Sequence, residues 1–398
     1  MKGGAAHRFR RTIMMNTATA SHWKLARRYG KLPFRSPVND VLAEMLSTVF
    51  SEEEAELAAT FPVRPVTAET ISRGARCEGE RVVSLLDAMD SRGVIGSFGA
   101  NHRRKFMLLP IVPGLYELVM WSGRTDEKTR RFPELYEQYY QADYFTAKPN
   151  RVIKIIPTEK HIDSHVGVLP TDRVSELIDS HTRFSLASCC CRHSAELRGT
   201  PCIKPKEVCM AFGQFADFLV DRDLARKADK AEIFEVADRA AEAGLVHLTD
   251  NVARANFLCS CCSCCCTGLK VITRFNYPWM IAKSHFKIEV DSARCANCGK
   301  CASRCPTQAV AWLEKQRVFD DGRCIGCGVC VSACDRHAAL KLVERPNYLR
   351  PNETVSQLAA DCGLQALGPM RLMADRFPGT YRRLRGVVEK GIAHGLKQ

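Results

Sequence analysis

Apolar residues recur at helical spacing in the stretch 229–247. Ile233, Val236 and Ala240 fall on one face of a helix, and charged residues occupy the opposite face. Gly244 follows the last apolar position and is suited to end the helix. The pattern predicts a helix whose apolar face belongs to a protein core.

The stretch 205–223 has a similar spacing. Phe212, Phe215 and Leu219 fall on one face, which predicts a second helix. Both predicted helices lie between two groups of cysteines along the chain. We therefore expect the helices to bring these two groups together, in a middle region that is mainly helical.

The residues before position 125 follow a different order. Residues 38–61 are predicted to be helical, with Ser51 before three acids as a signal for a helix start. Residues 67–110 then predict a helix, a turn, a helix and an apolar hairpin. This succession resembles a winged helix-turn-helix.

In a DNA-binding winged helix, the second helix, about 80–92, would enter the major groove, and 101–105 would be a basic wing on the phosphates. Acidic groups on that helix repel phosphate, so we expect protein interaction or scaffolding, with DNA binding as the less favoured alternative. The residues expected on its exposed face are Glu80, Ser84, Asp87 and Asp90.

The remaining segments without cysteine motifs are also predicted to be helical. Residues 116–145 are rich in aromatic residues and are expected to pack one domain on the next. Residues 353–395 read as helices after a linker, and Cys362 is expected to be a buried thiol. The glycine-rich motifs of phosphate-binding loops and of dinucleotide-binding folds are absent from the sequence.

Charge and composition describe an ordinary globular protein with a basic start. The net charge of +14 is concentrated in residues 1–35, which hold nine Lys and Arg residues and no acid. We expect this segment to be a disordered tail. The mean hydropathy is −0.18, and no apolar run is long enough to span a bilayer. A signal-peptide core is missing, so a cytoplasmic location is expected.

The chain has 21 cysteines, which points to metal ligation in a reducing compartment and not to a disulfide framework. Residues 295–306 read CANCGKCASRCP and residues 324–334 read CIGCGVCVSAC, with identical cysteine spacing. Three thiolates three residues apart suit one face of a cubane cluster, while the fourth cysteine points toward a second cluster. Paired zinc sites are the alternative, but they would leave the third cysteine of each motif unused.

These motifs resemble the bacterial two-cluster ferredoxins over about residues 286–345. The resemblance implies two 4Fe-4S clusters. The second motif has Asp335 where the family has proline, as at Pro306. The implied ligands are Cys295, Cys298, Cys301 and Cys334 for one cluster, and Cys305, Cys324, Cys327 and Cys330 for the other.

A second cysteine-rich region precedes these motifs. Residues 188–213 and 255–270 together contain eleven thiols, and six of them lie within the eight positions 259–266. The spacing resembles a recurring domain of anaerobic iron-sulfur proteins over about residues 150–285. By this resemblance Cys189, Cys191, Cys202 and Cys209 are candidates for a third cluster, and Cys259, Cys261, Cys262 and Cys265 for an additional site.

Vicinal thiols cannot all bind one cubane, so Cys190, Cys264 and Cys266 are left as free thiols, redox-active pairs or other ligands. Three interpretations stay open for this region: additional iron-sulfur clusters, a zinc or thiol-redox site, or an idle thiol-rich loop. Arg192 either stabilises a negatively charged cluster or forms a surface ion pair. His161 and His165 form no recognised metal motif and are expected to be ordinary polar residues. His193 is nearer to the cysteines, and the sequence assigns it no role.

The sequence thus predicts an α+β multidomain protein. It consists of a basic tail (1–35), a winged-helix-like domain (36–125), a cysteine-rich helical domain (126–285), a ferredoxin-like dicluster domain (286–345) and a helical tail (346–398). We expect an iron-sulfur protein that passes single low-potential electrons to or from a partner oxidoreductase. Six cations near the dicluster motifs favour an acidic partner: Arg294, Lys300, Arg304, Arg317, Arg323 and Arg336.

Two alternatives remain open at this point. One is a redox-sensing transcription regulator that couples the state of the clusters to the winged helix. The other is a reductase whose substrate binds at an extra cluster. The sequence offers no evident general acid or base, and the catalytic residues of an enzyme are unknown.

Overall fold

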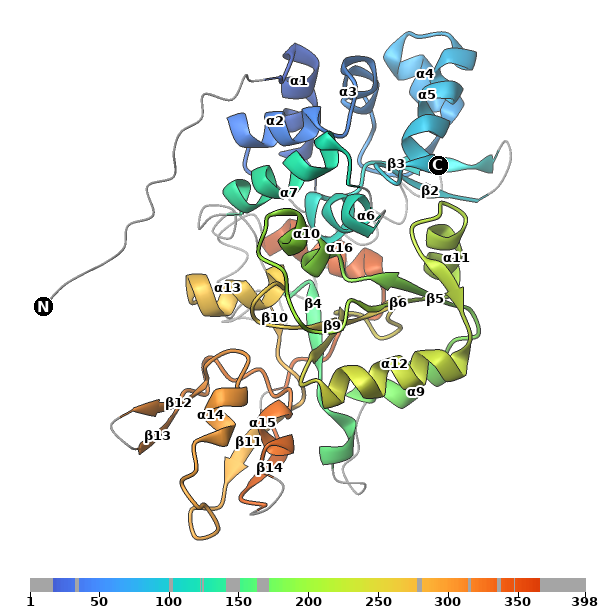
Figure 1. Ribbon diagram of the computed structural model, residues 1–398. Coiled ribbons are helices and arrows are strands. Elements are labelled where there is room, and N and C mark those ends of the chain that lie inside the picture. The colour runs from blue at the N-terminus through green and yellow to red at the C-terminus, as the bar shows by residue number, and fades with distance from the viewer. Residues whose placement is uncertain are drawn as a thin grey trace, which may run out of the picture.

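The protein was analysed as a computed structural model, which is a mixed α+β structure (Figure 1). The structure describes residues 17–32, 36–99, 103–121, 123, 125–140, 151–162, 172–277, 281–313, 316–334, 338–346 and 348–365.

Three helices open the described chain: α1 (Ala20–Tyr29), α2 (Asp40–Ser47) and α3 (Glu52–Ala58). Ser51 caps α3, since its hydroxyl accepts a hydrogen bond from the Glu54 amide and the Glu54 carboxylate accepts one from the Ser51 amide. The predicted helix start at Ser51 is confirmed.

The expectation of a disordered tail over residues 1–35 is wrong for residues 20–29, which form helix α1. Leu25, Ala26 and Tyr29 form an apolar stripe between the basic residues and are fully buried. Lys24 makes an ion pair with Glu56 of α3, with 2.6 Å between Nζ and Oε1. Residues 1–16 lie outside the described part of the chain.

A small antiparallel sheet and two helices follow. The elements are β1 (Val66–Thr67), α4 (Ala68–Ala75), α5 (Gly79–Ser91), β2 (Gly96–Phe98) and β3 (Lys105–Met107), and the strand order is β1-β3-β2. The predicted succession of helix, helix and hairpin is therefore present.

The prediction that Asp90 is exposed on α5 is wrong. Asp90 is buried and accepts hydrogen bonds from both Nε and Nη2 of Arg222, at 3.0 and 2.8 Å to Oδ1. Arg104 of the expected basic wing also bonds Asp87 and Asp90, at 2.7 and 3.2 Å. Asp87 and Asp90 of α5 thus bind arginines of the same chain, whereas Glu80 and Ser84 are exposed as predicted. The expected wing residues 101 and 102 lie outside the described residues.

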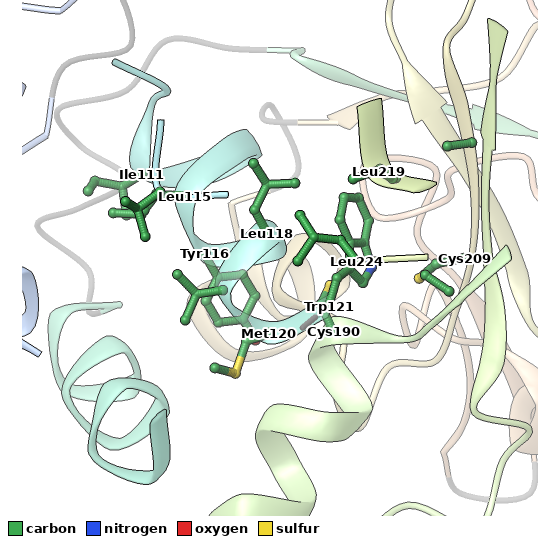
Figure 2. Close-up of a cluster of buried hydrophobic side chains, with 14 of the residues drawn as sticks. Ile111, Leu115, Tyr116, Leu118, Met120, Trp121, Cys190, Cys209, Leu219 and Leu224 are labelled. Atoms are coloured by element: carbon green, nitrogen blue, oxygen red, sulfur yellow. The ribbon is translucent and has the colours of Figure 1, made fainter. Parts of the chain in front are cut away.

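Helices α6 (Tyr116–Trp121) and α7 (Glu127–Tyr139) confirm the aromatic helical segment. Tyr116 of α6 stacks on Tyr136 of α7, with ring centroids 3.9 Å apart. Trp121 of α6 lies 6.0 Å from the ring of Phe215 in the middle region. As expected, these aromatic side chains pack one part of the chain on the next. Figure 2 shows Tyr116 and Trp121 in this core.

A seven-stranded sheet forms the middle of the molecule, with the strand order β10-β4-β8-β9-β6-β5-β7. Its strands are β4 (Ile153–Ile156), β5 (Phe184–Ser188), β6 (Glu207–Phe212), β7 (Arg226–Ala228), β8 (Val246–Asp250), β9 (Phe257–Cys261) and β10 (Ile281–Ala282). Only the β10–β4 pair among the described strands is parallel.

Five helices accompany the sheet: α9 (Val174–Asp179), α10 (Cys190–Leu197), α11 (Gly213–Val220), α12 (Lys230–Glu242) and α13 (Thr267–Phe275). In Figure 1, α9 and α12 lie below the sheet, and α10 lies above it. Helix α12 buries Ile233, Val236 and Ala240 as predicted, and Gly244 follows it with φ +72°.

The expectation of a mainly helical middle region is wrong, because this sheet is its centre. The single helix predicted over 205–223 is in fact strand β6 followed by helix α11. Strand β6 lies between β5 and β9 and is buried on both faces, so its residues lack the alternation that marks a half-exposed strand. Gly213, with φ +59°, marks the turn from strand to helix.

The ferredoxin-like segment consists of two strand pairs and two short helices. Strand β11 (Phe286–Val290) pairs with β14 (Leu340–Glu344), and β12 (Val310–Leu313) pairs with β13 (Gln316–Phe319). The helices are α14 (Lys300–Arg304) and α15 (Val329–Ser332). This segment extends from the lower side of the central sheet in Figure 1.

Helix α16 (Val355–Gln365) ends the described chain. It buries Cys362, which is 1% exposed, as predicted for a core thiol. The rest of the predicted helical tail, 366–398, lies outside the described residues. None of the helices in the described ranges combines the length and apolarity needed to cross a bilayer.

Candidate metal centres

Each cysteine motif of the ferredoxin-like segment leads into a short helix, α14 or α15, and these two helices contact each other. The loop of each motif enters its helix through a glycine with positive φ: Gly299 at +73° before α14 and Gly328 at +77° before α15. Only glycine adopts this conformation without strain. The two loops thus present their cysteines in the same way.

The cysteines predicted for the first cluster line one cavity. Cys295, Cys298 and Cys301 come from the first motif, and Cys334 comes from the end of the second. The cavity has about 360 Å³ of empty space, including space open to solvent, and Trp312 and Leu340 contribute to its apolar wall. Four thiols around an apolar cavity fit a cubane cluster.

A cation also faces this cavity. Arg317 donates a hydrogen bond from Nη1 to the sulfur of Cys295 at 2.9 Å. The pKa of Cys295 is lowered by its hydrogen bond with the Asn297 backbone and by Arg317. Both interactions favour the thiolate form that binds iron. Cys298 at the rim is exposed, so this cavity lies at the protein surface.

The cysteines predicted for the second cluster are more deeply placed. Cys324, Cys327 and Cys330 are buried, and Cys305 is partly buried beside them. Burial raises the pKa of Cys327 to about 12, and the neighbouring thiols of Cys324 and Cys305 add to the shift. Bound metal would supply the positive charge that keeps such buried thiols ionised.

The loop of the second motif packs closely against β11. A Cβ atom on Gly326 would lie 2.0 Å from the Phe286 carbonyl oxygen, and Gly326 has φ +71°. The equivalent position in the first motif is Asn297, which has φ +51° and is exposed. The same left-handed turn therefore accepts asparagine at the surface but has room only for glycine in the interior.

The eleven thiols of the middle region divide into two groups. The first, called the four-thiol site, has its sulfur atoms within 4.8 Å of one another. The sulfur of Cys202 lies 3.9 Å from that of Cys262 and 3.5 Å from that of Cys264. The members of the four-thiol site are Cys202, Cys262, Cys264 and Cys265.

The spacing in the four-thiol site suits a single tetrahedral ion. Zinc-thiolate bonds of about 2.3 Å place the sulfur atoms of a tetrahedron about 3.8 Å apart. Three of the sulfur separations are 3.5, 3.8 and 3.9 Å, close to this value, and all lie within 4.8 Å. A hydrogen bond from Cys265 and the charge of Arg192 lower the pKa of Cys262 to about 4, which favours metal binding.

The second group, called the seven-thiol group, is assembled from four separate segments. Cys209 on β6 lies directly opposite Cys259 on β9, and Cys261 ends β9. The first turn of α10 and the residue before α13 bring in the others. The members of the seven-thiol group are Cys189, Cys190, Cys191, Cys209, Cys259, Cys261 and Cys266.

Interactions between neighbouring thiols connect the seven-thiol group into a ring. Hydrogen bonding with Cys189, Cys190 and Cys266 lowers the pKa of Cys191. Hydrogen bonding with Cys189, Cys190 and Cys259 lowers the pKa of Cys209. The pKa values of Cys189, Cys190, Cys259 and Cys266 are raised, so the crowded thiols cannot all ionise without added positive charge.

Arg192 lies between the two groups. Its side chain is 1% exposed, so the interpretation as a surface ion pair is wrong. Nη2 donates to the Ser260 carbonyl at 3.2 Å, while Nε and Nη1 have no hydrogen-bond partner within the described structure. Burial lowers the pKa of Arg192, but the surrounding thiols, those of Cys189 and Cys262 foremost, raise it by more. A buried guanidinium with unpaired donors fits a position beside anionic thiolates.

An apolar layer connects the second ferredoxin motif to the seven-thiol group. Cys327 belongs to the same buried cluster as Cys261 and Cys266. The amide and hydroxyl of Thr158, just after β4, both donate to the Cys327 carbonyl, at 2.9 and 3.1 Å. The other members of this layer are Ile155, Val246, Leu248, Leu269, Ile272, Ile281, Ile325 and Val329.

Each ligand set predicted for the middle region has members in both the four-thiol site and the seven-thiol group. The structure places Cys202 in the four-thiol site and the other members of its predicted set, Cys189, Cys191 and Cys209, in the seven-thiol group. The second predicted set is divided in the same way, into Cys259 and Cys261 on one side and Cys262 and Cys265 on the other.

Three cysteines outside the predicted sets also belong to these groups. Cys264 is in the four-thiol site, and Cys190 and Cys266 are in the seven-thiol group. Adjacent side chains point in different directions, and this is why consecutive cysteines serve different groups. In the sequence, the position of these three cysteines inside the dense cysteine runs is the signal that could have identified them as group members.

Among the described residues, no histidine belongs to the four-thiol site. His161 forms a hydrogen bond with the Ser332 hydroxyl at 2.7 Å, between Nε2 and Oγ, and thus acts as an ordinary polar residue. His193 lies on α10, and His165 falls outside the described residues.

Comparison with known proteins agrees with the first two sites. Residues 287–335 match the family model described as a 4Fe-4S dicluster domain. No curated protein and no solved structure matched the chain. The chain therefore contains a 4Fe-4S dicluster domain, which implies two 4Fe-4S clusters and suggests an iron-sulfur electron-transfer role, together with a cysteine group elsewhere that could hold another metal.

Proposed function

We propose that the protein is an iron-sulfur electron-transfer protein that passes single low-potential electrons between a partner oxidoreductase and a redox centre in its own middle region. The observation that carries this proposal is the apolar layer shared by Cys327, Cys261 and Cys266. Metal centres exchange electrons efficiently when they are close and separated by packed protein. The exposed Cys298 gives the opposite end of the domain access to a partner.

The proposed ligands follow the two sets of the ferredoxin resemblance. The outer cluster is bound by the cysteines around the surface cavity, Cys295, Cys298, Cys301 and Cys334. The inner cluster is bound by Cys305, Cys324, Cys327 and Cys330, which are closer to the middle region. The clusters supply one-electron chemistry, and the protein supplies burial, thiolates and hydrogen bonds that tune their potentials.

For the four-thiol site we propose a single structural ion, most simply zinc. Its sulfur separations match one tetrahedral ion, and four thiolates leave no open position on it. Such an ion would join the 259–266 run to Cys202 and hold the adjacent seven-thiol group in place.

The partner is proposed to be acidic near its own redox centre. Arg294 and Lys300 are exposed beside the outer cluster, and Val318 and Phe319 offer exposed apolar surface on the neighbouring strand, 46% and 38% exposed. A cationic rim around an apolar contact is typical of transient electron-transfer surfaces, where charge steers the encounter.

The winged-helix-like region is proposed to serve as a scaffold and not as a DNA reader. The strand order β1-β3-β2 with the helices α4 and α5 supports the resemblance. However, Asp90 of the would-be recognition helix is bound to Arg222 of the middle region. This contact supports a packing role. Salt-dependent binding of DNA fragments that changes with cluster oxidation would favour the regulator instead.

The test of the electron-transfer proposal is a metal analysis of the anaerobically purified chain with EPR of the reduced sample. Two 4Fe-4S clusters predict about eight iron and eight sulfide per chain and two interacting cubane signals. A chain that binds only zinc in the ferredoxin motifs would refute the proposal. A chain whose cubanes cannot be reduced would also refute it.

A further inference from the structure

A large cleft opens between the N-terminal region and the central sheet. It encloses about 3440 Å³, including space open to solvent. Its walls come from the α5 to β3 region, from helices α6 and α11, and from strands of the sheet. The space is sufficient for an organic ligand and its path of entry.

Five members of the seven-thiol group line this cleft. They come from both clumps of cysteines in the sequence: Cys190, Cys191, Cys259, Cys261 and Cys266. Cys191 and Cys259 are partly exposed and the other three are buried, while the remaining two members, Cys189 and Cys209, are buried and are not among the lining residues. The group therefore has one side enclosed by protein and one side open to the cleft.

The cleft wall around these thiols is largely apolar. Trp121, Phe215 and Phe218 contribute aromatic surface, and Figure 2 shows Trp121 packed with Cys190 and Cys209 in one cluster. The arginines on the lining are paired with acids: Arg104 and Arg222 with Asp90, and Arg183 with Asp217. Arg222 also lies over the Phe218 ring, 3.8 Å from its centroid. A ligand with an apolar body is thus a better fit than a free anion such as phosphate.

Seven thiolates are too many for one ion, because a tetrahedral metal takes four. The sulfur atoms of Cys190 and Cys191 lie 3.9 Å apart, and the hydroxyl of Thr267 lies 3.8 Å from the Cys191 sulfur. Crowded thiolates of this number are what a centre with several metal ions bridged by sulfur requires. The buried Arg192 guanidinium would offset part of the negative charge.

We propose that the seven-thiol group holds a polynuclear metal-sulfur centre, distinct from the four-thiol site, with an open coordination position toward the cleft that binds a small organic ligand with an apolar body. This inference rests on the proposed function, because the centre would receive its electrons from the inner 4Fe-4S cluster beside Cys327. In that step the inner cluster is oxidised by one electron and the polynuclear centre is reduced by one, with no bond made or broken.

The test uses the full chain, loaded with iron and sulfide under anaerobic conditions and reduced with dithionite. The probe is tert-butyl isocyanide, which combines a metal-binding carbon with an apolar body. We expect an EPR signal in addition to those of the two ferredoxin clusters, and we expect the isocyanide to shift its g values alone. An additional signal that does not respond to the isocyanide, or no additional signal, would overturn the inference.

Two double variants make a matched pair. Cys191→Ala with Cys266→Ala removes two ligands from the open side of the seven-thiol group. Cys202→Ala with Cys264→Ala removes two from the four-thiol site. The first pair should abolish the isocyanide response and lower the iron content, whereas the second should lose about one metal ion and keep the response.

The outcomes also separate this inference from the proposed function. If the two ferredoxin signals are present but the isocyanide-sensitive signal is not, only the inference fails. If the ferredoxin signals themselves are missing, the proposed function fails as well. Retention of the isocyanide response in the Cys191→Ala, Cys266→Ala variant would place the open centre elsewhere and would overturn the assignment to these thiols.

Discussion

Replacing Gly326 with alanine should disrupt the inner cluster far more than the same change at Gly299. The two glycines have nearly the same positive φ, +71° and +73°. An added Cβ at Gly299 would meet only Trp312, at 3.8 Å, which is an ordinary contact. At Gly326 it would lie 2.0 Å from the Phe286 carbonyl oxygen and 2.3 Å from the Ser284 hydroxyl.

The magnitude follows from these distances. A left-handed conformation costs an alanine about 1–2 kcal/mol, and this term is common to both variants. At Gly326 the loop must also move by more than an ångström, and overpacking of this kind costs roughly 1–3 kcal/mol or more. The loop cannot move freely, because Ser284 donates from its amide to the Ile325 carbonyl at 3.1 Å and from its hydroxyl to the Gly326 carbonyl at 2.7 Å.

We therefore expect the free energy of unfolding to fall by about 2–5 kcal/mol for Gly326→Ala and by about 1–2 kcal/mol for Gly299→Ala. The assay is urea unfolding of the anaerobic holoprotein, with iron content and EPR measured on the same samples. Gly326→Ala should lose the inner cluster and keep the outer one. Equal losses of unfolding free energy for the two variants would refute the steric argument, because the cost of the left-handed backbone conformation would then explain both.

Three further predictions concern stability and partner binding. Asp172→Asn should lower the free energy of unfolding in urea by about 3–5 kcal/mol, because it leaves the buried ammonium of Lys154 without its carboxylate. The Lys154 side chain is 1% exposed and its Nζ lies 2.7 Å from the Asp172 carboxylate. An unchanged urea midpoint would contradict this prediction. Burial lowers the pKa of His247 from 6.5 to about 4. The neutral His247 side chain therefore contributes stability above pH 6.5, and this contribution is lost as the pH falls toward 4. His247→Gln should therefore gain about 2 kcal/mol relative to wild type between pH 7 and pH 5, and a pH-independent difference between the two proteins would count against it. Lys300→Glu should slow electron exchange with an acidic carrier such as flavodoxin several-fold at low ionic strength, and the difference should vanish at high salt.

The sequence by itself determined the chemistry of the ferredoxin-like segment. Three cysteines at a fixed spacing of three residues, followed by a fourth, act through a local loop whose geometry depends on few distant contacts. The same is true of local signals such as Ser51 before Glu54 and Gly244 after α12. These features could be predicted from the sequence because the residues that form each of them lie within a few positions of one another.

The tertiary structure decided how the other eleven thiols are grouped. Cys209 and Cys259 are 50 positions apart in the chain and become neighbours only because β6 pairs with β9. Consecutive cysteines such as Cys261 and Cys262 serve different groups, because adjacent side chains point in different directions. Spacing along the chain carries no information on such long-range pairing.

The burial of the sheet and of its charges was likewise decided by tertiary packing. Strand β6 is apolar on both faces because it lies between two strands and under helices, so its pattern could be mistaken for that of a helix. Asp90 and Arg192 are charged residues that a sequence pattern assigns to the surface. Each is buried because a distant partner, Arg222 for Asp90 and the two thiol groups for Arg192, compensates its charge.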